Sequence, residues 1–206
     1  MKVKVWSDYI CPWCYLGQDR TALLRSLDVA VTPQPFELHP DLPPEGRPVK
    51  PNGRLAAAYG AIGRECEAIG MPFRAPTHVP NSRRALETAE VVRQRWPASF
   101  PALDAALFDA HFVSGGDIGD PDVLTTLVNQ TGAPSREVSA ALEAGEGRVA
   151  VTASMEAARD LGIAATPAWL FGETFVVPGV QPRELFERVV SRLRARIGAT
   201  PTGPGQ

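Results

Sequence analysis

Residues 2–38 contain two strand-like segments with a helical segment between them, and few folds accommodate that order. Apolar and polar residues alternate over residues 2–7, which indicates a half-buried strand. After Pro12, which suits the first turn of a helix, residues 13–27 place leucines on a helical period. The β-branched run at residues 29–38 predicts a second strand. Together the segments predict one βαβ unit with parallel strands and a right-handed crossover.

The middle of the chain has a different pattern. Residues 39–53 hold five of the 20 prolines, so this segment is predicted to be a loop. From residue 53 to residue 145, apolar residues recur at spacings of three and four with almost no strand signal. The helix beginning at Asp120 has the expected start, with Asp120 as N-cap before Pro121. These residues predict an all-helical block.

The last part of the chain again contains predicted strands as well as helices. A helix is expected over residues 147–161, then two short apolar runs joined by Gly172-Glu173 as a hairpin, then a helix from residue 182. A lone hairpin and a lone parallel pair are each marginal, so we expect them to join in one sheet. The predicted class is α/β, a mixed four-stranded sheet flanked by helices. The sheet domain would span 1–40 and 146–200, with an inserted helical domain at 41–145 and a disordered tail at 201–206.

Composition and charge exclude several classes of protein. The 206 residues are 44% hydrophobic, enough for a core, and no apolar stretch is long enough to span a bilayer. With 21 Lys and Arg against 23 Asp and Glu, the net charge is −2 and no basic run is present. We therefore expect no membrane insertion and no nucleic-acid partner. The N-terminus lacks a secretory signal pattern, so a cytoplasmic location is expected.

Cys11 and Cys14 form a CPWC motif where the first strand meets the first helix. Unpaired amide groups and the dipole at a helix N-terminus lower a thiol pKa and favour the reactive thiolate. Cys14 lies one turn further on, so it can close a disulfide with Cys11. A zinc half-site is the alternative, but neither a second CxxC nor an HxxxH motif is present. We therefore expect a dithiol switch and no bound metal.

Thr166 and Pro167 directly precede the third predicted strand. If that strand lies beside the first, this loop faces the CPWC motif. A cis Thr166-Pro167 bond would expose the Thr166 backbone to an extended substrate. Most X-Pro bonds are trans, so the residues alone leave the isomer open. Pro12 and Trp13 would flank the same surface, with Trp13 shielding or presenting the thiols.

The order of these motifs resembles the DsbA family of the thioredoxin superfamily, and in particular its FrnE-like branch. Four segments carry the resemblance: SDYICPWCYLG, FELHPDLPPEG, ALFDAHFVSGGDIGDPDVL and EAARDLGIAATPAW. It implies a thioredoxin-like fold, Cys11 as attacking thiol, Cys14 as buried resolving thiol and a cis Pro167. One departure is Ala164-Ala165, where the family commonly has a glycine and an apolar residue. This difference concerns the width of the substrate groove.

The resemblance implies a thiol-disulfide oxidoreductase that forms a mixed disulfide with its substrate. No cofactor is expected, with glutathione as a candidate redox partner, and the sequence leaves formation of a homodimer open. A different enzyme class remains as an alternative. The superfamily includes glutathione-dependent isomerases and transferases, such as 2-hydroxychromene-2-carboxylate isomerase, which typically carry serine at the position of Cys11. A third hypothesis is a binding module in which the dithiol is idle.

Other residues with reactive side chains are expected to be structural. Cys66 and His111 share helical faces with apolar residues and should be buried. Asp8 is expected to hold the turn at the end of the first strand, with a role as proton acceptor or as tuner of the Cys11 pKa as the alternative. Phe36 and Trp169 have strand spacing and should lie in the core, as should Phe171.

Overall fold

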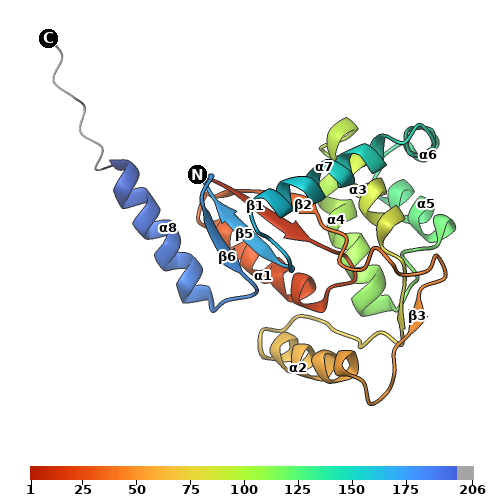
Figure 1. Cartoon of the computed structure of the whole chain (residues 1–206), viewed down its shortest axis with the longest axis horizontal. Helices are drawn as coiled ribbons and strands as arrows, with labels where there is room; N and C mark the ends of the chain where they lie inside the picture. Colours follow the sequence, from red (N-terminus) through yellow and green to blue (C-terminus); the bar gives the residue numbers. More distant parts are fainter. Residues whose placement is uncertain (199–206) are drawn as a thin grey trace, which may run out of the picture.

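A computed structural model describes residues 1–198 and contains a four-stranded mixed sheet with helices on both faces (Figure 1). The strands are β1 (Lys2–Ser7), β2 (Ala30–Pro35), β5 (Ala168–Phe171) and β6 (Phe175–Pro178). They lie in the order β2-β1-β5-β6, with β1 parallel to β2 and antiparallel to β5. Strands β5 and β6 form the hairpin, joined by residues 172–174. The predicted α/β class and mixed four-stranded sheet are confirmed.

The two faces of the sheet pack against different helices because successive side chains of a strand point to opposite faces. Val3 and Val5 pack with the apolar residues of α1 (Pro12–Ser26) and α8 (Arg183–Gly198). Trp6, the residue after Val5, points to the other face, where its indole N–H donates to the Ser154 carbonyl of α7 (Glu146–Asp160) at 3.2 Å. Phe36, Trp169 and Phe171 are buried as expected; their exposed fractions are 7%, 1% and 2%.

The turn between β1 and α1 is held by Asp8, which is fully buried. Its carboxylate accepts hydrogen bonds from the backbone N–H groups of Leu38, at 2.7 Å, and Ile10, at 3.3 Å. The expected turn role of Asp8 is thus confirmed. Helix α1 then begins with Cys11 as N-cap and Pro12 at its first position. The missing N–H of proline costs nothing there.

Between β2 and α7 the chain forms a mainly helical insertion. Its helices are α2 (Arg54–Ala68), α3 (Arg83–Arg95), α4 (Phe100–Asp109), the π-helix η1 (Ala110–Ser114), α5 (Pro121–Gln130) and α6 (Ser135–Glu143). Asp120 caps α5 by accepting from Asp122 N, as predicted. The expectation of an all-helical block is wrong in one respect. Two short strands, β3 (Arg47–Pro48) and β4 (His78–Val79), pair antiparallel, and two-residue strands leave no alternating pattern.

The insertion packs directly on the helix that carries the CPWC motif. Tyr15 and Leu16 of α1 belong to the same apolar cluster as Ile62 of α2 and Phe108 of α4. The Tyr15 ring lies 5.1 Å from the ring of Phe112 in η1. Residues far apart in sequence therefore share one core around the start of α1.

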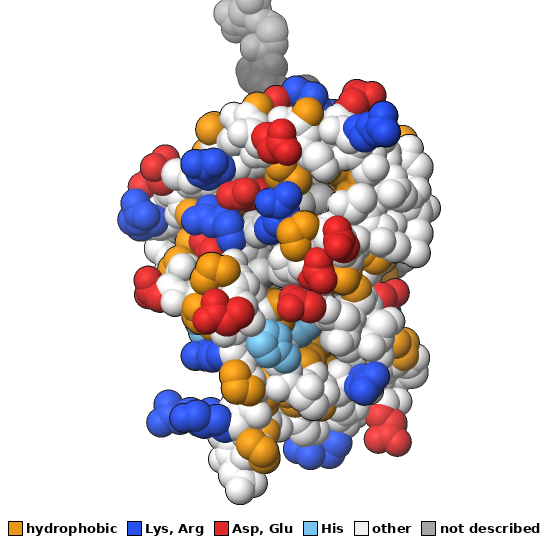
Figure 2. All heavy atoms as spheres, turned by 90° about the vertical axis from the view of Figure 1, so that its right-hand side faces the viewer, with side chains coloured by type: hydrophobic (Ala, Val, Ile, Leu, Met, Phe, Trp, Pro, Cys, Tyr) orange, Lys and Arg blue, Asp and Glu red, His pale blue; other side chains and the backbone are white. Residues whose placement is uncertain are grey.

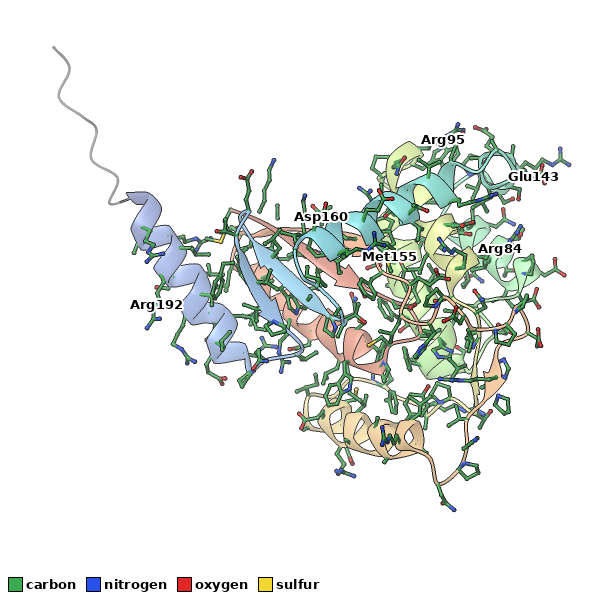
Figure 3. All side chains as sticks on the ribbon, in the orientation of Figure 1. Arg84, Arg95, Glu143, Met155, Asp160 and Arg192 are labelled. Atoms are coloured by element: carbon green, nitrogen blue, oxygen red, sulfur yellow. The ribbon has the colours of Figure 1, made fainter. Side chains whose placement is uncertain are left out.

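Helix α7 connects the insertion to the sheet. Figure 3 shows Arg95 at the end of α3 beside the first part of α7, where it pairs with Glu146 at 2.6 Å. Further along α7, Met155 packs over the face of the sheet that contains Trp6. The sulfur of Met155 also lies 3.1 Å from the backbone N–H of Glu37.

Close contact between α7 and α3 allows a test of this packing. A Cβ atom on Gly147 would lie 2.6 Å from the carbonyl oxygen of Glu87, so Gly147→Ala should lower the free energy of unfolding by about 1–3 kcal/mol. Gly60 in α2 is a matched control, since its Cβ would meet only the end of Arg64, at 3.9 Å. Gly60→Ala should raise stability by up to about 1 kcal/mol, because alanine favours helix. Urea unfolding followed by circular dichroism measures both, and equal stability of the two variants would contradict this packing.

Within residues 1–198, no helix is both long and apolar enough to cross a membrane. On the face drawn in Figure 2, acidic and basic side chains are interspersed. The predicted disordered tail at residues 201–206 lies outside the described residues.

Candidate active site

The two thiols of the CPWC motif lie at the N-terminus of α1, at the carboxyl end of β1. Both cysteines are reduced and buried, with exposed fractions of 3% for Cys11 and 2% for Cys14. The Cys11 carbonyl accepts hydrogen bonds from the backbone N–H groups of Cys14, at 3.0 Å, and Tyr15, at 3.1 Å. The first turn of the helix therefore fixes the two cysteines on the same side.

The surroundings of Cys11 lower the pKa of its thiol. The largest cause is a hydrogen bond from the Cys14 side chain, and Thr166 and the Cys14 backbone N–H add to it. Burial opposes the shift, as does the charge of Asp8. From the sequence, the amide groups at the helix N-terminus were expected to be the main cause of the lowered Cys11 pKa. In the structure the neighbouring thiol is the main stabilising group, because it donates directly to the Cys11 sulfur.

The pKa of Cys14 shifts in the opposite direction. Burial raises it well above its ordinary value, and the hydrogen bond that Cys14 donates to Cys11 raises it further. The neighbouring polar groups of Ser7 and Thr166 lower it to a smaller extent. The two cysteines are almost equally buried, so exposure does not show which of them is the nucleophile. Their opposite pKa shifts do, because only a thiolate is a good nucleophile. The arrangement therefore favours Cys11 as the attacking sulfur.

The loop before β5 borders the thiols, as the sequence predicted. The Thr166-Pro167 peptide bond is cis, and the Thr166 carbonyl oxygen lies 3.6 Å from Cys11 Sγ. The Pro167 carbonyl accepts from the Gly179 N–H at 2.7 Å, which ties the loop to the end of β6. Pro167 is buried and Thr166 is half-buried. Segments 155 positions apart thus meet at one sulfur.

The remaining residues of the motif contribute differently. Pro12 is buried at the first position of α1, whereas Trp13 is 39% exposed. Trp13 therefore offers an apolar surface beside Cys11. All six predicted site residues, Cys11, Pro12, Trp13, Cys14, Thr166 and Pro167, lie at this end of the sheet.

Cys66 and His111 stay outside this group. Cys66 is fully buried in α2, and burial raises its pKa to about 11. His111 is 1% exposed, and burial lowers its pKa to about 4. Both shifts favour the uncharged form at neutral pH, which agrees with the structural role predicted for each.

Two further residues near the thiols could not be recognised as site neighbours from the sequence. Ser7 lies near the Cys14 side chain and lowers the pKa of that thiol, although its position at the end of a strand is ordinary. Tyr59 in α2 is 2% exposed, and within residues 1–198 its hydroxyl has no hydrogen-bond partner. Burial raises the pKa of Tyr59 to about 12, with the charge of Cys11 as the next cause. In the sequence, Tyr59 cannot be distinguished from the other apolar residues on the same helical face.

A cavity of about 290 Å³ lies away from the thiols. It is lined by residues that include Glu45, Arg74, His78, His111 and Asp117. Histidine side chains reach the surface near acidic residues on the face shown in Figure 2. Among the residues that the structure describes, no group of three or more His, Cys, Asp or Glu side chains could hold a metal ion.

Comparisons with known proteins agree with this architecture. A family model described as "DSBA-like thioredoxin domain" matches residues 2–191. A probable DsbA oxidoreductase from Streptomyces coelicolor is 24% identical, with a TM-score of 0.84 over 100% of this chain and 93% of that one.

Two further solved structures share the fold. The cytosolic disulfide reductase DsbM from Pseudomonas aeruginosa is 19% identical, with a TM-score of 0.68 over 95% of this chain and 100% of that one, and its structure is also known with GSH. A 2-hydroxychromene-2-carboxylate isomerase is 15% identical, with a TM-score of 0.76 over 98% and 100% of the two chains.

Proposed function

The chain belongs to the DSBA-like thioredoxin domain family, and from this we propose that it is a thiol-disulfide oxidoreductase. Cys11 attacks a substrate disulfide, a mixed disulfide forms, and Cys14 displaces the product. The substrate is a protein or small molecule that carries a disulfide or thiol. We place the activity in the cytoplasm, which the likeness to a cytosolic reductase supports.

The single observation that carries the proposal is the opposite behaviour of two adjacent thiols. The pKa of Cys11 is lowered and that of Cys14 is raised, and each is a principal cause of the shift in the other. One sulfur is thereby ready to attack while the other holds its proton until it is needed. The Thr166 backbone beside Cys11 and the exposed Trp13 would hold an extended substrate at the reacting sulfur.

Titration of the reduced protein tests this proposal. In a Cys66→Ala background, only Cys11 and Cys14 contribute thiolate absorbance. We expect one thiol to ionise with a midpoint below the value of about 8.5 typical of free cysteine, and the second to ionise far above it. Two midpoints near 8.5 would remove the basis of the proposal and favour the idle binding module.

The same titration reports the redox tendency of the pair. A stabilised thiolate favours the reduced form, so a lower Cys11 pKa makes the disulfide form a stronger oxidant. We propose glutathione as a redox partner, supported by the determination of the DsbM structure with GSH.

A glutathione-dependent isomerase or transferase is the second candidate, and the fold shared with the isomerase favours it. In that reaction the site would hold glutathione without a redox cycle. Calorimetric titration separates the candidates. Reversible glutathione binding after both cysteines are alkylated would support the isomerase, whereas a covalent adduct that depends on Cys11 would support the oxidoreductase.

A further inference from the structure

Three basic residues before and at the start of α2 line one cavity and have no ion-pair partner. Arg47, Lys50 and Arg54 border a cavity of about 240 Å³, and no acidic residue is among those that line it. All three are exposed, and none forms an ion pair with another described residue. The whole chain has a net charge of −2, so this cavity is a positive site on a slightly negative protein.

The backbone that carries these three cations is fixed. Arg47 belongs to β3, which pairs with β4. The Gly53 N–H donates to the Lys50 carbonyl at 2.9 Å, and Arg54 is the first residue of α2. The positions of the three cations are therefore set before a ligand arrives, which lowers the entropic cost of binding.

The acidic residues nearby in sequence line other cavities. Asp41 lines a second cavity, also of about 240 Å³, to which Arg47 contributes as well. Glu45 lines the larger cavity of about 290 Å³. Neither carboxylate forms an ion pair with one of the three cations. The positive charge is thus left for a partner outside the described chain.

The two cavities that share Arg47 adjoin one another. Residues 38–43 line one of them and residues 47–50 and 53–55 line the other, and we call the two together the Arg47 groove. Prolines in both parts of the lining restrict the backbone there. A single small anion would fill only one part of the groove. An extended polypeptide can occupy both parts, which favours a peptide segment as the occupant.

The Arg47 groove lies near the reactive thiol. Val49 and Leu55 of its lining pack against the apolar cluster that contains Cys11 and Tyr59. Burial is the largest cause of the raised pKa of Tyr59; the charge of Cys11 raises it further, and the charge of Arg47 lowers it. Tyr59 therefore lies close to both charges. A polypeptide whose disulfide reaches Cys11 can extend from there into the groove.

We propose that the Arg47 groove binds an acidic segment of a protein substrate, next to the disulfide that Cys11 attacks. This inference rests on the proposed oxidoreductase function and narrows its substrates to proteins with Asp or Glu near the reacting disulfide. Ion pairs with exposed cations contribute little individually. Together, three cations of one sign attract an oppositely charged partner and raise its rate of association, most strongly at low salt.

Two peptide disulfides test this preference. Each is a symmetric dimer joined by one disulfide, with Glu residues flanking the cysteine in one peptide and Gln residues in the other. Reduced protein is mixed with each dimer and quenched with acid at intervals, and the released thiol peptide is measured by chromatography. At low salt the parent protein should reduce the Glu dimer about 10-fold faster, the lower end of the usual range for electrostatic steering. At about 1 M salt, screening should remove the preference.

A triple variant tests whether the groove causes the preference. Combined Arg47→Gln, Lys50→Gln and Arg54→Gln should reduce the Glu dimer no faster than the Gln dimer. A matched control removes the same charge from exposed residues of α6, α7 and α8 and should keep the parental preference. The control substitutions are Arg136→Gln, Arg148→Gln and Arg188→Gln. If both triple variants lose the preference equally, net charge attracts the peptide and the inference is overturned.

A binding measurement is independent of disulfide chemistry. The probe is a fluorescent Glu peptide with serine in place of its cysteine, and fluorescence anisotropy reports its binding. Its Kd should rise about 10-fold in the triple variant and should not change in the control variant. Should the triple variant not fold, Arg54→Gln alone decides the matter. A parental Kd and a parental preference in that variant would overturn the inference.

The outcomes separate this inference from the function on which it rests. If the parent protein reduces both dimers at the same rate, the groove does not select acidic segments and the oxidoreductase proposal stands. If the parent protein reduces neither dimer, the proposed function fails, and the anisotropy measurement still reports on the groove. Oxidised glutathione is the last substrate to compare. If the triple variant loses as much activity with it as with the Glu dimer, the groove serves a small carboxylate ligand, and its assignment to a polypeptide is wrong.

Discussion

Replacement of Cys11 by serine should reduce disulfide exchange to the rate of a blank without protein. A serine hydroxyl is not ionised at neutral pH, so the neighbouring groups that lower the pKa of Cys11 have no thiolate to stabilise. The loss should be complete, because Cys14 is buried and protonated and cannot replace Cys11 as nucleophile. Insulin reduction followed by turbidity, with dithiothreitol as reductant, measures the effect.

Cys66→Ala is the matched control for this experiment, since it also removes one buried thiol. It should retain the activity of the parent protein, because Cys66 lies outside the site. An active Cys11→Ser variant would rule out the oxidoreductase. If that variant also bound glutathione reversibly, the isomerase alternative would gain support.

Replacement of Cys14 by serine should trap the protein in mixed disulfides. Cys11 can still attack, but no second sulfur is present to displace the substrate. With a peptide disulfide as substrate, we expect an adduct of one peptide per protein that persists until a reductant is added. Mass spectrometry under non-reducing conditions detects it, and the parent protein under the same conditions should show mainly the internal disulfide.

The same variant should also react more slowly in the first step at neutral pH. The Cys14 side chain is the largest cause of the lowered pKa of Cys11, so its loss should raise that pKa. The rate of adduct formation should consequently increase up to a higher pH than in the parent protein. A Cys14→Ser variant that turns over without accumulating adduct would contradict the assigned role of Cys14.

Much of the sheet could be predicted because its segments carry strong local signals. Alternation over residues 2–7 and a proline at the start of α1 fixed the first strand and helix within a residue. Strands β3 and β4 could not be predicted, because two residues have no period and one of the four is a proline. The π-helix at residues 110–114 likewise depends on packing, since its residues continue the helical pattern of α4.

The sequence indicated the residues of the candidate site better than their energetics. It placed Cys11 at the helix start from local chain order, and it placed Thr166 opposite Cys11 once the third strand was expected beside the first. It could not show that the Cys14 side chain would be the main cause of the Cys11 pKa shift.

The meeting of Cys11 with Thr166 has a consequence for biosynthesis. Cys11 is translated early, but Thr166 leaves the ribosome only after the entire insertion. Pairing of β1 with β5 spans the same interval, and contacts this distant in sequence form late. In a nascent chain Cys11 therefore lacks the part of its pKa shift that comes from Thr166. The surface that would hold an extended substrate beside Cys11 is likewise completed only when the segment containing Thr166 and β5 has been synthesised.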